Sequence, residues 1–150
     1  MKREIIHLCE QPQLFEQAAQ WFHEKWKVPL QAYLDSMEEG RDADSGVPAW
    51  YILMENGAII AGLGVIENDF HKRKDLRPNI CAVYVEEAYR KQGIARQLLD
   101  YACEQLARKG ISTVYLITGH SGLYERMGWQ FEGMIEENDG GLIRMYRHDM

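Results

Sequence analysis

The chain has 150 residues, of which 46% are hydrophobic and 27% charged, and its formal net charge is −6. These values predict one globular domain, residues 1–150, and they argue against nucleic acid as the main partner, because phosphate binding requires a basic surface. No apolar run approaches the roughly 20 residues of a membrane span. The three cysteines are scattered and no zinc-type spacing occurs, which indicates free thiols in the cytoplasm and no metal site.

The N-terminal half alternates short apolar runs with two stretches of helical spacing. We expect, in chain order, a strand at Glu4–Cys9, a helix from Pro12 to Trp26, a helix at Leu30–Glu39, a loop at 40–48, and strands at Ala49–Met54 and Ala58–Glu67. The dipeptide Asn56-Gly57 between the last two runs is typical of a tight hairpin. Gly62 and Gly64 inside the following strand predict a bulge, or a close approach by a ligand or another backbone.

The C-terminal half continues with a strand, a tight turn and a helix. We expect a loop at Asn68–Asn79, strands at Ile80–Val85, Ser112–Thr118, Trp129–Ile135 and Leu142–Arg147, a helix over 94–109 and a short helix at Ser121–Met127. A right-handed crossover through the longer helix would make the strand at 112–118 parallel to the strand at 80–85. The predicted fold class is therefore α/β, with a mixed α+β sheet in the order β-α-α-β-β-β-α-β-α-β-β and helices on its faces.

The turn between the strand at 80–85 and the helix after it has the features of an anion site. The first amides of a helix have no partner within the helix, and the helix dipole adds partial positive charge there. Gly93 has no side chain, so backbone can approach an anion closely, and Ala95 keeps the next position small. Arg90 and Arg96 add cationic side chains. A phosphate or pyrophosphate suits such a place, although an ordinary turn with Gly93 serving geometry alone would share the pattern.

Two motifs resemble those of the GCN5-related N-acetyltransferase (GNAT) superfamily. Arg90, Gly93 and Ala95 fill its phosphate-loop pattern of Gln or Arg, two residues, Gly, one residue, and Gly or Ala. Residues Leu123–Trp129, Leu-Tyr-Glu-Arg-Met-Gly-Trp, are similar to the family's second motif, [FL]-Y-E-[KR]-x-G-[FW]. The predicted order of elements also matches the GNAT order.

The resemblance implies that acetyl-coenzyme A is the cofactor. The backbone amides of residues 92–96 would hold its pyrophosphate, and the strand at 80–85 would pair with the pantetheine arm as if with another strand. The cofactor-binding residues implied in this way are Val83, Tyr84, Val85, Arg90, Lys91, Gln92, Gly93, Ile94, Ala95 and Arg96.

The resemblance assigns the acid role to a tyrosine and leaves the base open. Tyr124 matches the family tyrosine, and a phenol can protonate or hydrogen-bond the departing thiolate, although a core aromatic would satisfy the same motif. Some relatives carry a carboxylate near the position of Asn79, which is no base. Glu67 and Asp69 are the substitutes that we expect to relay a proton through water, and Asp69 is also suited to holding a cationic amine. Solvated loop carboxylates are the alternative for both.

The N-terminal helices usually shape the acceptor site in this family. Trp21, Glu24 and Trp26 are the candidates there, together with Asn79 and Tyr33, because aromatic faces beside a carboxylate suit a cationic amine. Tryptophans at helical spacing are more often core residues. His120, where the last short helix is expected to begin, is either a cap or a site residue.

The predicted activity is that of an acetyl-coenzyme-A-dependent N-acetyltransferase working by direct transfer in a ternary complex. The acceptor would be a primary amine, either a small molecule such as an aminoglycoside, polyamine or amino acid, or a peptide amine. Homodimers are common among such folds, so pairing with a second copy is also expected. The alternative is a catalytically idle acyl-CoA-binding module that regulates a partner, because residue 79 is no carboxylate.

Overall fold

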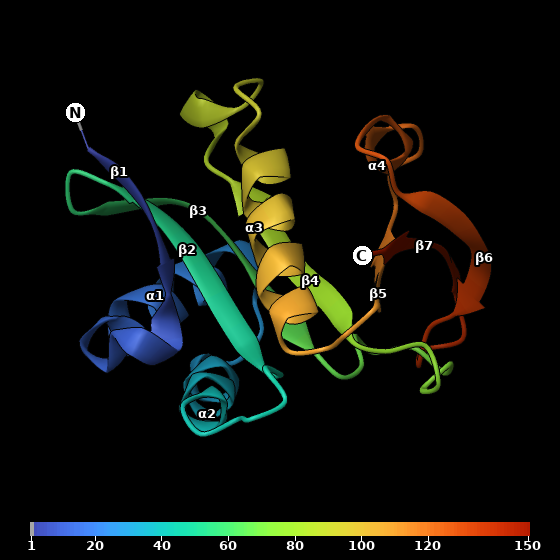
Figure 1. Cartoon of the computed structure of the whole chain (residues 1–150), viewed down its shortest axis with the longest axis horizontal. Coiled ribbons are helices and arrows are strands. Elements are labelled where there is room, and N and C mark those ends of the chain that lie inside the picture. Colours follow the sequence, from blue (N-terminus) through green and yellow to red (C-terminus); the bar gives the residue numbers. More distant parts are fainter. Residues whose placement is uncertain (1) are drawn as a thin grey trace.

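The computed structural model describes residues 2–150, which form one sheet with helices on both faces (Figure 1). In chain order the helices and strands are β1 (Arg3–His7), α1 (Phe15–Trp26), α2 (Leu30–Gly40), β2 (Ala49–Glu55), β3 (Ala58–Ile66), β4 (Asn79–Val85), α3 (Ile94–Arg108), β5 (Thr113–Thr118), α4 (Leu123–Arg126), β6 (Gln130–Glu136) and β7 (Leu142–Asp149). This confirms the predicted order of helices and strands.

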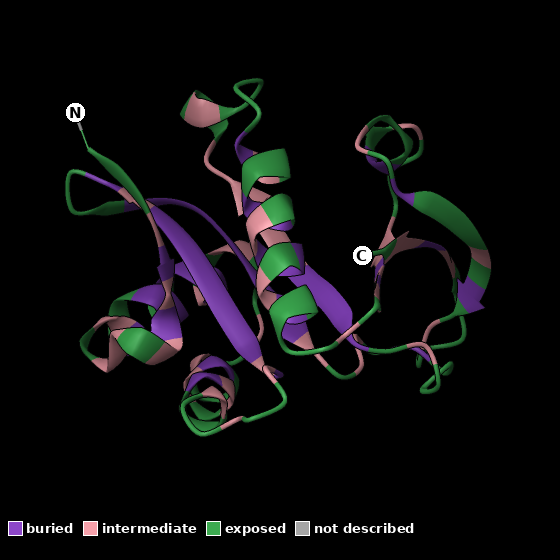
Figure 2. Ribbon diagram, in the orientation of Figure 1, coloured by how far each residue is buried: buried purple, intermediate pink, exposed green. Residues whose placement is uncertain are grey.

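The seven strands lie in the order β1-β2-β3-β4-β5-β7-β6. β4 and β5 are parallel, as the crossover through α3 predicts, and all other neighbours are antiparallel. The buried face of α3 packs with one side of the sheet, and α1 and α2 pack with the other side of its N-terminal strands. Burial is therefore concentrated in the central strands and the helix faces that cover them, as Figure 2 shows.

Several boundaries differ from the sequence prediction. β1 ends at His7, where its pairing with β2 ends, and Leu8–Glu10 form a 3-10 turn instead of more strand. The first helix begins at Phe15, because Pro12–Leu14 form another 3-10 turn. Asn79 opens β4 instead of ending the loop. The helix expected over 121–127 is only α4, because Gly122 has a left-handed backbone and caps it with help from the side chain of Glu125.

The two glycines of β3 mark a bulge and a close approach. The register between β3 and β4 shifts between Gly62 and Gly64, so that one residue of β3 faces two of β4. The close approach comes from aromatic rings and not from a ligand. A Cβ on Gly62 would lie 2.8 Å from the ring of Phe22, and one on Gly64 would overlap the ring of Trp50.

Gly64→Ala should therefore lower the free energy of unfolding by about 1 to 3 kcal/mol, because the Trp50 ring cannot withdraw from a packed core without strain. Gly119→Ala is the matched control, since no atom lies within 4 Å of its Cβ position. We expect that change to alter stability by less than about 0.5 kcal/mol. Urea unfolding measures both, and equal stability of the two variants would contradict the packing described.

The sheet opens between β4 and β5. Only Asn79 and Ile80 of β4 pair with β5, at Tyr115 and Leu116, and the two strands then separate toward the end where α4 lies (Figure 1). Ala82 has a φ of +55° inside the bulge, which turns β4 away from a regular ladder. The edge of β4 beyond Ile80 is consequently free to pair with something other than β5.

Candidate active site

A cleft of about 1190 Å³ occupies the opening between β4 and β5. Its walls come from β4, the start of α3, the end of β5, α4, and the loop after β3, with part of α1 and α2. The wall includes much of the free edge of β4, the turn that begins α3 and the tyrosine of α4. The structure thus brings the two predicted sequence motifs to a single cavity.

The turn after β4 presents backbone donors to this cleft. Lys91 and Gly93 have left-handed backbones, with φ of +65° and +78°, and Gly93 is the N-cap of α3. The first intrahelical bond goes from Gln97 to the Gly93 carbonyl, so the amides of residues 94–96 have no acceptor within the helix. No atom lies within 4 Å of the Cβ position of Gly93, which leaves open space for an anion.

Most of the residues implied as cofactor contacts line the cleft. These are Val83, Tyr84, Val85, Arg90, Lys91, Gly93, Ile94, Ala95 and Arg96. Arg90 is held by a hydrogen bond from its Nε to the Val85 carbonyl, 2.9 Å long. Gln92 does not line the cleft, and its side-chain oxygen accepts a bond from Arg3 Nη2 at 3.2 Å.

Tyr124 is both a packed core aromatic and a lining residue of the cleft. Only 6% of the residue is exposed, and its ring packs edge-on against Trp129 with centroids 6.0 Å apart. The residue also lines the cleft. Burial raises the pKa of its hydroxyl to about 12, so the phenol is protonated at neutral pH and can donate a hydrogen bond into the cleft.

Of the two carboxylates proposed as a base, only Asp69 lines the cleft. It follows β3, whose last residue Ile66 pairs with the first residue of β4, so Asp69 lies at the opposite end of β4 from Gly93. The pKa of the Asp69 carboxyl is raised to about 6, mainly by burial; nearby His71 lowers it and the charge of Glu137 adds to the rise. Glu67 is exposed, lies outside the lining and pairs with Arg77 at 3.2 Å.

Comparison with known proteins identifies the family. Residues 12–129 match the family model described as "Acetyltransferase (GNAT) family". The chain belongs to the GNAT acetyltransferase family. A search of curated proteins finds no match to it.

Solved structures share the fold at low sequence identity. The Salmonella typhimurium protein YncA, solved with its cofactor acetyl-CoA, is 13% identical with a TM-score of 0.73, covering 99% of this chain and 94% of that one. An aminoglycoside 6'-N-acetyltransferase complexed with coenzyme A is 15% identical with a TM-score of 0.71, covering 99% and 97%. A chain of the NatC complex bound to Gag peptide and CoA is 19% identical with a TM-score of 0.73, covering 100% and 99%.

The GNAT acceptor candidates divide into two groups. Trp26 lines the cleft and is 45% exposed, and Tyr33 lines it too. Trp21, Glu24 and Asn79 do not line it. Trp21 is buried and donates its indole N–H to Glu86 at 3.3 Å, and Glu24 accepts a bond from Gln20. Asn79 is fully buried.

Sequence reasoning missed several residues that line this GNAT cleft. They are Ser36, Trp50, Phe70, Cys81 and Glu137. Phe70 had a usable signal, because it is a lone aromatic in a polar loop and is 63% exposed. Glu137 had none, since it lies 68 residues from Asp69 and only the fold brings the two together.

His120 lines the cleft, and Gly122, not His120, is the N-cap of α4.

Among residues 2–150 no helix is long and apolar enough to cross a membrane. Within the same residues, no three His, Cys, Asp or Glu side chains converge as ligands for a metal ion.

Proposed function

We propose that this GNAT protein transfers the acetyl group of acetyl-coenzyme A directly to a primary amine. The observation that carries the proposal is the composition of one cleft. An amide-bearing turn lies at one end of β4, a partly buried carboxylate lies at the other end, and a protonated phenol lines the same cleft. A coupled assay of thiol release over a panel of amines tests it.

The cofactor end supports binding of coenzyme A. Its diphosphate would accept hydrogen bonds from the amides of residues 94–96, and Arg90, Lys91 and Arg96 add positive charge to the same wall. The amides of the pantetheine arm would pair with the free edge of β4, which β5 leaves open after Ile80. Three structural neighbours were solved with acetyl-CoA or coenzyme A.

The transfer itself needs one proton acceptor and one proton donor. The amine nitrogen attacks the thioester carbonyl carbon, a C–N bond forms, and the C–S bond breaks. Asp69 takes the proton of the amine, directly or through water, and Tyr124 donates its proton toward the departing sulfur. Burial raises the pKa of Asp69 to about 6 and would lower the pKa of an ammonium bound beside it. The two pKa values are then closer together, which makes the proton transfer easier.

The acceptor end favours a cationic amine. Tyr33, Trp50 and Phe70 line the cleft on the side of Asp69 with aromatic surface, and Trp26 lines it beside Tyr84. Small amines of the aminoglycoside, polyamine or amino-acid type and peptide amines share this chemistry. The structural neighbours include both an aminoglycoside enzyme and a peptide-bound complex, so the amine panel should contain each type.

Tyr124→Phe should lower kcat by about 100-fold and leave the affinity for acetyl-coenzyme A nearly unchanged, because the proton donor is lost while the ring still fills its place. Tyr101→Phe is the matched control, since Tyr101 packs against Tyr51 outside the cleft. Steady-state kinetics with the best amine of the panel measure the effect. Undiminished turnover in the phenylalanine variant would remove Tyr124 from the mechanism.

A catalytically idle acyl-CoA-binding module remains the competing description of the same cleft. It was suggested by the absence of a carboxylate at residue 79, but Asp69 lines the acceptor end instead. Turnover that disappears in both Tyr124→Phe and Asp69→Asn counts against the idle module. Coenzyme A binding with no turnover of any amine would favour it.

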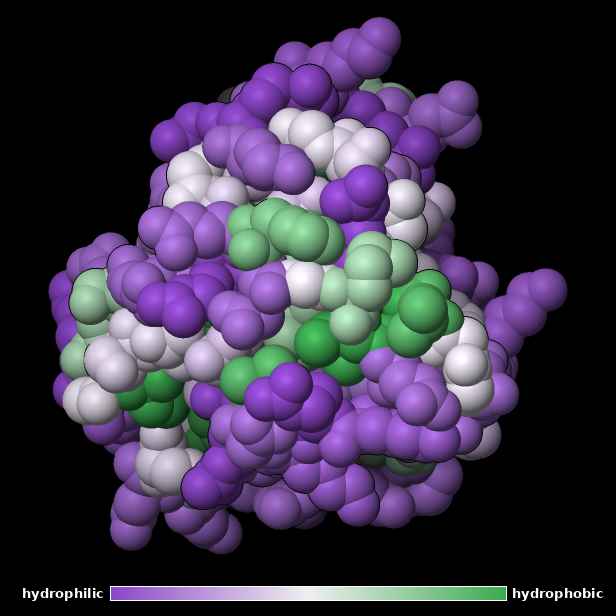
Figure 3. Space-filling view, turned by 90° about the vertical axis from the view of Figure 1, so that its right-hand side faces the viewer, coloured by the Kyte–Doolittle hydropathy of each residue, from purple (hydrophilic) through white to green (hydrophobic). Residues whose placement is uncertain are grey.

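We also propose that two copies pair and that the protein works in the cytoplasm. Phe131, Met134 and Leu142 are exposed, and the register of β6 and β7 places them on one face of this edge hairpin. Figure 3 views the molecule from the side of the hairpin and shows apolar side chains gathered in a band between polar surfaces. Free thiols at Cys81 and Cys103 support a reducing compartment.

A further inference from the structure

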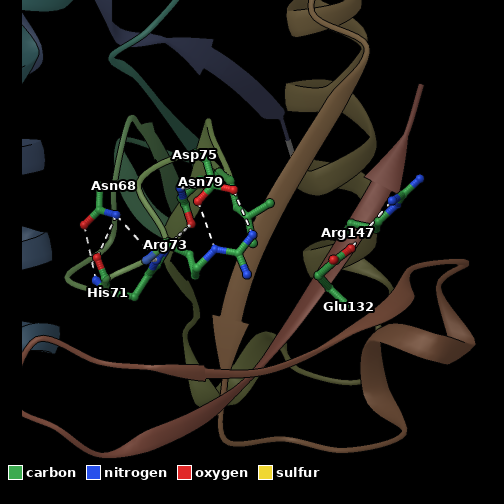
Figure 4. Close-up of polar contacts among 8 residues, drawn as sticks. Asn68, His71, Arg73, Asp75, Asn79, Glu132 and Arg147 are labelled. Carbon is green, nitrogen blue, oxygen red and sulfur yellow. Dashed lines mark hydrogen bonds and ion pairs between the residues drawn. The ribbon is translucent and has the colours of Figure 1, made fainter.

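The loop between β3 and β4 contains a buried polar network centred on His71. His71 and Asn79 are both fully buried, and the ring Nε2–H of His71 donates to the Asn79 side-chain oxygen at 2.8 Å. The backbone N–H of Arg73 donates to the other ring nitrogen at 3.2 Å, which requires that nitrogen to be unprotonated. These bonds select one neutral tautomer of His71. Figure 4 shows His71 with its partners Asn68, Arg73 and Asn79.

Asn79 and Asn68 complete the network. The side-chain nitrogen of Asn79 donates to the carbonyls of Glu67 at 2.8 Å and Leu76 at 3.0 Å, so it ties the start of the loop to its end. Asn68 bonds His71 three times: it accepts from the His71 backbone N–H at 3.2 Å, and its side-chain nitrogen donates to the His71 carbonyl at 3.0 Å and to the ring Nδ1 at 3.4 Å. Both polar ends of the buried Asn79 amide therefore have partners, and the loop has one favoured conformation.

Asp69 and Phe70 lie in the chain between Asn68 and His71, two residues of this network. Phe70 has a φ of +61°, a conformation that residues with side chains rarely adopt and that persists only where surrounding contacts enforce it. The same turn is bonded to the segment after β6, since Phe70 accepts from the Asn138 amide and the Lys72 amide donates to Glu136, each at 2.9 Å. The contacts fix Asp69 from both sides.

We infer that His71 and Asn79 are positioning residues, which hold the Asp69 carboxylate in the acceptor end of the cleft and keep it from solvent. This rests on the proposed function, in which Asp69 takes the proton of the amine. Besides His71, the titratable groups that act on Asp69 or respond to it are Glu137 after β6, Cys81 on β4 and Tyr33 on α2. None of these three belongs to the network, so changing His71 leaves them in place.

His71→Phe tests the inference, because it removes every hydrogen bond of the ring and keeps an aromatic ring of similar size. We expect kcat/KM for the amine to fall by about 100-fold, since the base is displaced, while the Kd for acetyl-coenzyme A stays within about two-fold. The acid limb of the pH profile should also move below its wild-type position, because a solvated Asp69 loses the burial that raises its pKa most, and this outweighs the loss of the His71 ring that lowers it. His71→Gln, which retains a side-chain donor toward Asn79, should recover most of the activity and the limb.

A purely structural role predicts something different. In that case activity and acetyl-coenzyme A affinity would fall together and the acid limb would keep its midpoint, which would overturn the inference. If His71→Phe does not fold, Asn68→Ala opens the same turn from its more exposed side and should shift the limb in the same direction. A wild-type profile without an acid limb near pH 6, or full activity in Asp69→Asn, would instead refute Asp69 as the base. Either result contradicts the proposed function, and it can be told apart from a failure of the inference about His71.

Discussion

Asp69→Asn should reduce kcat/KM for the acceptor amine by about 100-fold or more at pH 7, because an amide cannot accept the proton that the attacking amine must lose. Burial raises the pKa of this carboxyl to about 6, so the wild-type enzyme should lose activity as the pH falls through 6. The asparagine variant should lack that limb. Initial rates between pH 5 and 8 measure both effects.

The same substitution should stabilise the fold at pH 7. The folded-state pKa of about 6 lies above the usual value of 3.8, so the folded protein binds more protons than the unfolded chain between these two values. Stability contributed by this group is therefore present at low pH and lost as the pH rises through 6. Removing the charge should raise the Tm at pH 7, which separates lost chemistry from lost structure.

Glu67→Gln is the control for Asp69→Asn, because Glu67 is exposed and pairs with Arg77 outside the cleft. Its kcat/KM should stay within about two-fold of the wild-type value. A large loss in the Glu67 variant combined with a small one in the Asp69 variant would reverse the assignment of the base.

Gly93→Glu should weaken acetyl-coenzyme A binding by more than about 100-fold. Gly93 has a φ of +78° at the N-terminus of α3, with open space beyond its Cβ position. A glutamate there would put negative charge and bulk where the diphosphate is proposed to lie, and charge repulsion replaces the amide contacts. Isothermal titration calorimetry measures the Kd directly.

Gly110→Glu provides a closely matched control for that experiment. Gly110 follows the other end of α3, has a φ of +86°, and also has no atom within 4 Å of its Cβ position. The variant therefore carries the same added charge and a similar backbone strain far from the turn. It should bind acetyl-coenzyme A as the wild type does, and equal losses in both variants would show that strain, and not the site, is responsible.

The cofactor end of the cleft was predictable because its determinants are local in the sequence. The free amides of α3 follow from a helix start, and Gly93 marks that start within a few residues of the strand. The hairpin at Asn56-Gly57 was predictable for the same reason, and both residues adopt left-handed backbones there.

The acceptor end was less predictable because distant elements build it. Trp21 and Trp26 share helix α1, and helical spacing cannot tell which one faces a cleft, although only Trp26 does. Asn79 stands near the position where some relatives carry a catalytic carboxylate. Its side-chain amide instead bonds to His71 and to the Glu67 carbonyl, and no spacing rule in the sequence reveals this network. Glu137 lines the cleft only because the fold brings the segment after β6 next to the loop after β3.

A crystal structure of the protein with coenzyme A tests the account most directly. We expect diphosphate oxygens about 2.7 to 3.2 Å from the amide nitrogens of residues 94–96, with the thiol end directed to the hydroxyl of Tyr124. A diphosphate bound elsewhere, or a phenol oxygen turned away from the sulfur, would contradict it.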